Sequence, residues 1–139
     1  MSKSATWENG IIYLVFMNFD FSGVGDAGGL RGSASSGGFW LSLHSANPLE
    51  NATQETNEVV YGSYARQQVL RDSVQWNPQL NVTVSFPKGT GGSDLATHVG
   101  IGTSQTGPGK LLYAAPLAIP LNCGLGITPT VTGGSISES

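Results

Sequence analysis

Apolar and polar residues alternate along several short stretches of this chain. Phe39-Trp-Leu-Ser-Leu-His44 places Phe and Leu at odd positions and Trp, Ser and His at even positions. This period of two is typical of a strand with one buried face, and Asn47-Pro48 ends it because proline donates no amide hydrogen. Residues 81–86 and 97–102 alternate in the same way, with Val82, Val84 and Phe86 inward in the first, and Val99 and Ile101 on one face in the second.

The stretch Asn57–Arg66 predicts two strands with a kink between them. Val59–Tyr61 is apolar, Gly62-Ser63 interrupts the pattern, and Tyr64–Leu70 resumes it. Arg66 lies two residues from Tyr64, so both side chains point to the same face. Two interpretations stay open: Arg66 stacks on Tyr64 and pairs with a carboxylate such as Glu58, or it contacts a neighbouring subunit.

Near the N-terminus the pattern favours a short helix. Thr6 is the expected N-cap and Glu8 lies in the first turn. Trp7, Ile11, Leu14 and Val15 then form one helical stripe. The apolar run over residues 11–16 could equally form a buried strand, since continuous apolar runs are ambiguous.

Residues 19–38 have a different composition. Seven of the sixteen residues from Gly23 to Gly38 are glycine, and three are serine. Ordering such a segment costs much conformational entropy. We expect a flexible loop, or an arm that becomes ordered against a partner.

The rest of the chain completes an all-β pattern. Apolar runs recur over 110–115, 116–121 and 126–131, and Pro116, Pro120 and Pro129 belong at edges or turns. About seven or eight short strands without helices between them predict antiparallel sheets, packed as a jelly roll or β-sandwich. We expect a single domain over 1–139: an N-terminal segment and flexible arm (1–38), a sandwich core (39–131) and a loose tail (132–139).

Composition narrows the possible partners. The net charge is −3 and the six basic residues are scattered, which argues against nucleic-acid binding. Charged residues make up only 11% of the chain, which suits a protein packed against neighbours. The run Ile11–Met17 is too short to span a membrane. The single cysteine, Cys123, is expected to be a small buried residue.

Candidate chemistry is sparse, and we expect no catalytic, cofactor or metal site and no enzyme activity. Gly23–Gly28 matches the dinucleotide pattern G-x-G-x-x-G, but the residues after it do not predict the helix that such a site needs. His44, His98 and Asp94 could converge on a metal, although two histidines from distant strands are thin support. The tryptophans Trp7, Trp40 and Trp76 are not spaced as a single sugar-binding platform.

Several segments together resemble a family of small proteins of tailed bacteriophages. They are Leu43-His-Ser-Ala-Asn-Pro48, Glu58-Val-Val-Tyr-Gly-Ser-Tyr-Ala-Arg66 and Thr97-His-Val-Gly-Ile101, within a resemblance that covers roughly residues 39 to 115. Members are often labelled tail or fibre proteins. The size and the glycine-rich arm look most like a capsid cement (decoration) protein of the jelly-roll type known from a Bordetella phage.

The resemblance implies a structural role. We expect a virion protein, made in the cytoplasm of the bacterial host, that binds the outer capsid surface, clamps neighbouring major capsid subunits and forms a homodimer on two-fold axes. The alternatives are a tail or tail-fibre-associated protein and a host-surface glycan-binding module. The candidate partner contacts are Trp7, Phe19, Phe21, Leu30, Arg31, Tyr61, Tyr64 and Arg66.

Overall fold

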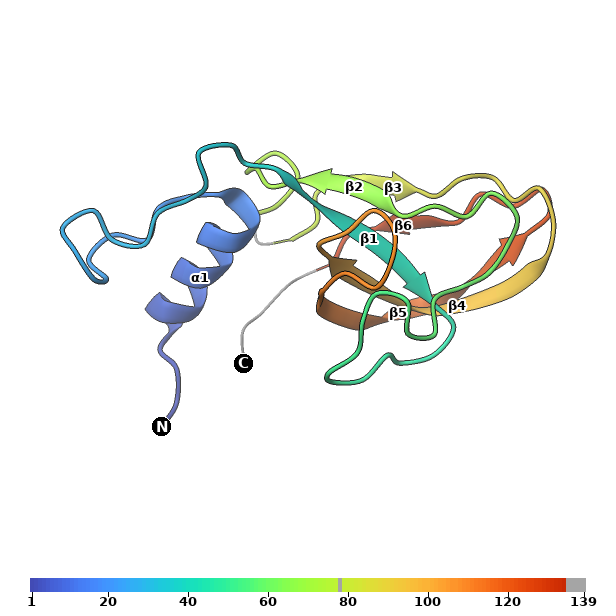
Figure 1. Cartoon of the computed structure of the whole chain (residues 1–139), viewed down its shortest axis with the longest axis horizontal. Coiled ribbons are helices and arrows are strands. Elements are labelled where there is room, and N and C mark those ends of the chain that lie inside the picture. The colour runs from blue at the N-terminus through green and yellow to red at the C-terminus, as the bar shows by residue number, and fades with distance from the viewer. Residues whose placement is uncertain (78, 135–139) are drawn as a thin grey trace. The chain divides into compact units, whose positions relative to one another are not determined.

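The computed structural model describes residues 1–77 and 79–134. Along this described chain the elements are α1 (Ala5–Met17), β1 (Gly38–His44), β2 (Gln67–Leu70), β3 (Thr83–Ser85), β4 (Ser93–Gly102), β5 (Leu111–Gly124) and β6 (Thr130–Thr132). One sheet has the order β2-β1-β4-β5, and β3 pairs with β6 in a second (Figure 1). The β1–β4 and β4–β5 pairs are antiparallel. The predicted all-β sandwich with a short N-terminal helix is confirmed.

The chain forms two compact units. Unit 1 contains residues 1–37, 70–83 and the described chain end from Thr132, and unit 2 contains residues 38–69 and 84–131. Division into a segment, a core and a tail stays a prediction. Of the tail expected to be loose, residues 135–139 lie outside the described residues.

Helix α1 in unit 1 begins and ends at two well-defined caps. Ser4, not the expected Thr6, is the N-cap and accepts a hydrogen bond from the Trp7 amide at 3.3 Å. Asn18 ends the helix in the left-handed conformation (φ 60°). The predicted stripe is also wrong: the buried residues are Ile12, Phe16 and Met17, because Phe16 packs on Trp76 at 4.9 Å between ring centroids.

The glycine-rich segment folds back on itself in unit 1. Phe21 and Leu30 exchange backbone hydrogen bonds of 2.8 and 2.9 Å, and the Asn18 side chain bonds Ser33 through both its oxygen and its nitrogen. Arg71 donates to the carbonyls of Leu14 and Ser36. These bonds close the loop within the chain, while its flexibility stays a prediction.

Strand β1 in unit 2 is buried on both faces, which differs from the prediction. Leu41 and Leu43 are buried as expected, but Ser42 and His44 are 0% exposed as well. The reason is that β1 is a central strand and the polar loop that follows it folds back over the Ser42 face. Of the strands predicted over Val59–Tyr61 and Tyr64–Leu70, only β2 is formed, because residues 59–66 make isolated backbone hydrogen bonds, from Val59 to Leu43 and between Gly62 and Gly91, and no continuous ladder.

Strand β4 is most deeply buried at its small residues. Ala96, Gly100 and Gly102 are buried, whereas Val99 and Ile101 are half-buried. A Cβ atom on Gly100 would lie 2.5 Å from His44 Nε2 and 2.8 Å from Ser42 Oγ. The two glycines therefore make room for polar side chains that pack on the sheet.

Strand β5 forms an edge of the larger sheet and carries Pro116 and Pro120, as predicted for prolines. Its register against β4 shifts between Ala96 and His98 and again between Ile101 and Gly102. Cys123 is 2% exposed, so its expected burial is confirmed.

We expect Gly100→Ala to destabilise unit 2 by about 1–3 kcal/mol, because an added methyl group meets atoms of His44, Ser42 and Leu111 in a packed site. Urea unfolding followed by tryptophan fluorescence measures the change. The matched control is Gly91→Ala, whose Cβ would meet nothing within 4 Å. Equal stability of the two variants would contradict this packing.

Candidate functional site

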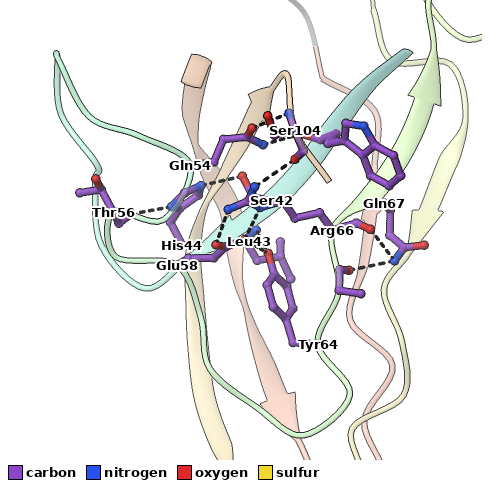
Figure 2. Close-up of polar contacts among 12 residues, drawn as sticks. Ser42, Leu43, His44, Gln54, Thr56, Glu58, Tyr64, Arg66, Gln67 and Ser104 are labelled. Carbon is purple, nitrogen blue, oxygen red and sulfur yellow. Dashed lines mark hydrogen bonds and ion pairs between the residues drawn. The ribbon is translucent and has the colours of Figure 1, made fainter. Parts of the chain in front are cut away.

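The most connected polar group in unit 2 is an ion pair between Glu58 and Arg66. Arg66 Nε donates to Glu58 Oε1 and Arg66 Nη2 to Glu58 Oε2, each at 2.7 Å, so the pair is bidentate (Figure 2). The side chain of Arg66 is only 3% exposed, and that of Glu58 is 15% exposed. The hydrogen bonds to Glu58 raise the pKa of Arg66, so the guanidinium stays charged. Of the two open interpretations, the pairing with Glu58 is observed.

Tyr64 joins this pair to strand β1. Its hydroxyl donates to Glu58 Oε1 at 2.7 Å and accepts the Leu43 amide at 3.1 Å. The centroid of the Tyr64 ring lies 5.4 Å from the ring centroid of Tyr61 and 6.2 Å from that of Phe86, on which Tyr64 stacks. Burial raises the pKa of Tyr64, so the phenol stays protonated and can donate.

Two further contacts extend the network to the loops. Arg66 Nη1 donates to the Ser104 carbonyl at 3.0 Å, and the Ser104 amide donates to Gln54 Oε1 at 2.9 Å. Gln54 Nε2 donates to the Trp40 carbonyl at 3.2 Å, and Gln54 is fully buried. The Arg66 guanidinium and the Gln54 carboxamide thus connect the loop at Ser104 to the loop that follows β1.

His44 is buried in the same region and uses both ring nitrogens. Nδ1 lies 2.8 Å from the Thr56 carbonyl and Nε2 lies 2.8 Å from Ser42 Oγ (Figure 2). A carbonyl only accepts, so Nδ1 carries the proton and Nε2 accepts from the serine hydroxyl. Burial lowers the pKa of His44, which keeps the ring neutral.

These contacts do not make a metal centre. His44 and His98 are cross-strand neighbours on β1 and β4, but Asp94 lies four residues further along and accepts the Val60 amide at 2.8 Å. Within residues 1–77 and 79–134, no group of three or more His, Cys, Asp or Glu side chains is placed to hold an ion. No helix of the described chain is long and apolar enough to span a membrane.

The structure distributes the predicted contact residues over both units. In unit 1, Trp7 and Phe19 are 41% and 49% exposed, Phe21 lies 5.8 Å from Trp7 and bonds Leu30, and Arg31 pairs with Asp26. In unit 2, Tyr61 and Arg66 are buried and Tyr64 is half-buried. Their roles as partner contacts stay predictions.

Sequence reasoning missed Ser42, Gln54, Thr56 and Ser104. Only Ser42 gave a signal, because it is a polar residue between two apolar residues of a predicted strand. Gln54, Thr56 and Ser104 belong to loops, and a loop residue gives no periodic signal.

We expect Arg66→Ala to destabilise unit 2 by roughly 3–5 kcal/mol, because it leaves the Glu58 carboxylate without its cation in a buried site. The matched control is Arg31→Ala, which breaks an ion pair whose side chains are 58% and 65% exposed and should cost about 0–1 kcal/mol. Chemical denaturation of the purified variants measures both. Near-wild-type stability of Arg66→Ala would contradict the structural role.

The lowered pKa of His44 predicts a stability that falls in acid. The unfolded chain binds a proton at the ordinary pKa of about 6.5, while the folded chain resists protonation, so stability is full above that pH and declines below it. The slope is at most about 1.4 kcal/mol per pH unit for one proton. Urea midpoints at pH 7.5 and pH 5.0 test this, and in His44→Gln the dependence should weaken.

A family model matches most of the chain. The family model described as "Podophage GP4 fiber I protein gp80" matches residues 29–138, which includes the strands and the whole polar network. A search of curated proteins found no significant match. The family description supports the expected alternative, a fibre protein, better than the capsid cement protein. The chain therefore belongs to the podophage fibre protein family of gp80 and is a structural protein of the bacteriophage virion.

Proposed function

We propose that this chain is a non-enzymatic component of the phage fibre or tail that holds neighbouring virion proteins in place. The observation that carries the proposal is the family match over residues 29–138, because a fibre family is a family of structural parts. The match extends across most of the chain, so it concerns the fold as a whole and not a local motif.

The polar network supports a mechanical role. His44, Glu58, Tyr64 and Arg66 carry the chemistry that an active site would use, yet each is bound to other atoms of unit 2. A fully bonded network inside a sheet makes the structure rigid, whereas catalysis needs groups that reach a substrate. Rigidity is what a connector under load requires.

Unit 1 offers surface for a neighbouring protein. Trp7 and Phe19 are large apolar residues that remain partly exposed, at 41% and 49%. Aromatic residues at such positions are favoured at protein interfaces. We propose that they contact another fibre or tail protein, or a second copy of this chain.

We expect few copies of this chain in each particle, located at the tail. Quantitative mass spectrometry of purified virions gives the copy number relative to the major capsid protein, and immunogold labelling gives the location. Label spread over the shell, with copies on the order of hundreds as a symmetric lattice requires, would support capsid clamping and contradict this proposal.

A further inference from the structure

The one Asn-Gly pair of the chain, Asn9-Gly10, lies in helix α1 of unit 1. The side chain of Asn9 is exposed. In a flexible chain such a pair reacts with itself: the main-chain nitrogen of the glycine attacks the side-chain carbonyl carbon of the asparagine and expels ammonia. Glycine favours this attack because it has no side chain to obstruct ring closure and adopts the required backbone angles. The pair is therefore a candidate for modification.

An intact α-helix opposes this reaction at Asn9. In the helix interior each amide N–H donates to the carbonyl four residues earlier, and the helical backbone angles keep the Gly10 nitrogen away from the Asn9 side-chain carbon. Ring closure therefore takes place only from conformations in which the helix is locally open. The pair lies in the first turns of α1, which begins at Ala5, and the ends of helices open most easily.

The glycine-rich segment covers this part of the helix. A Cβ atom on Gly10 would overlap the ring of Phe21, at 2.5 Å from its Cδ1 and Cζ atoms. The Phe21 ring thus lies against the Gly10 backbone itself, and its centroid is 5.8 Å from the ring centroid of Trp7, three residues earlier on the helix. Glycine is unfavourable in a helix interior, and this close contact is a reason for one here.

Phe21 is anchored through its own segment. It exchanges backbone hydrogen bonds of 2.8 and 2.9 Å with Leu30. Asp20 Oδ1 accepts the Gly32 amide at 2.8 Å. A Cβ atom on Gly32 would lie 2.5 Å from the carbonyl oxygen of Asn18, the residue that ends α1. The position of Phe21 on the helix therefore depends on the folding of the whole segment.

We propose that Asn9-Gly10 is a site of spontaneous deamidation, and that the glycine-rich segment sets its rate through the contact between Phe21 and Gly10. The Gly10 nitrogen loses its proton and bonds the Asn9 Cγ atom, the Cγ–Nδ2 bond breaks, and ammonia leaves. Water then opens the resulting succinimide ring at either carbonyl, which gives aspartate or isoaspartate at position 9. This inference does not depend on the proposed fibre function.

The two products change unit 1 in different ways. Aspartate adds a negative charge next to Glu8 near the start of α1, where the helix dipole favours it. Isoaspartate carries the main chain through the former side chain and adds one carbon atom, which breaks the helical repeat between Trp7 and Gly10. Phe21 then loses the surface that these two residues form. Isoaspartate at position 9 therefore releases the glycine-rich segment from the helix.

The first test compares folded and unfolded chains. Purified protein is incubated in mildly alkaline buffer with and without urea, and peptide mapping by mass spectrometry follows the modification at position 9. We expect the folded chain to react at least about tenfold more slowly, because the reaction needs local opening. Equal rates in both states, or no modification of Asn9 in urea, overturns the proposal.

Variants test the role of the contact. Phe21→Ala should accelerate the reaction of the folded chain at least about tenfold, since it removes the ring that covers Gly10. The matched control is Phe19→Ala, an exposed aromatic residue of the same segment that is not among the nearest neighbours of Gly10. Gly32→Ala disturbs the segment without altering Phe21 and should act in the same direction, and it decides the question if Phe21→Ala loses helix by circular dichroism. Wild-type rates in Phe21→Ala or, in that case, in Gly32→Ala overturn the proposal.

Trypsin tests the release of the segment. The isoaspartate form is separated by chromatography, and its cleavage after Arg31, whose side chain is 58% exposed, is followed under native conditions. We expect faster cleavage than in the unmodified chain, because the segment no longer packs on the helix. Equal cleavage of the two forms overturns the release.

Discussion

The bidentate pair between Glu58 and Arg66 is the interaction on which the rest of unit 2 depends. Residues 57–66 form no strand. Asn57 and Val59 make backbone hydrogen bonds to Ser45 and Leu43, Gly62 makes them to Thr90 and Gly91, and side chains add further contacts. Glu58 binds both Arg66 and the Tyr64 hydroxyl, Tyr64 in turn binds the β1 backbone, and Arg66 reaches the Ser104 carbonyl. A buried pair of this kind contributes more to a unique arrangement than to net stability, because desolvation offsets much of its Coulomb energy.

This arrangement gives the chemically active residue types of unit 2 a structural role. His44 and Gln54 occupy space above Gly100 and Gly102, where the sheet has no side chains of its own. Their polar atoms bind carbonyls and amides that the loops would otherwise leave unpaired in the interior. Polar side chains thus replace part of the hydrogen bonding that a regular ladder would supply, and the loops become a rigid layer on β1 and β4.

The sequence predicted the fold class, β1 and the edge position of the prolines, because alternation and the missing proline amide are local properties. The spacing of Tyr64 and Arg66 placed the two side chains on one face, and pairing of Arg66 with a carboxylate such as Glu58 was one of two open interpretations. It placed Val99 and Ile101 on one face of β4 but did not predict that two glycines of the other face are buried. Glycine is buried here because other residues fill its space, and only tertiary structure reveals that.

Unit 2 combines a rigid polar network with an exposed residue in a strained conformation, Leu49. The network holds the base of the loop that follows β1: His44 binds the Thr56 carbonyl and Asn57 binds the Asn47 carbonyl. A loop fixed at both ends can hold Leu49 at φ 66°, a conformation that an unrestrained loop would leave. These bonds therefore do more than connect strands, because they hold both ends of the loop that carries Leu49.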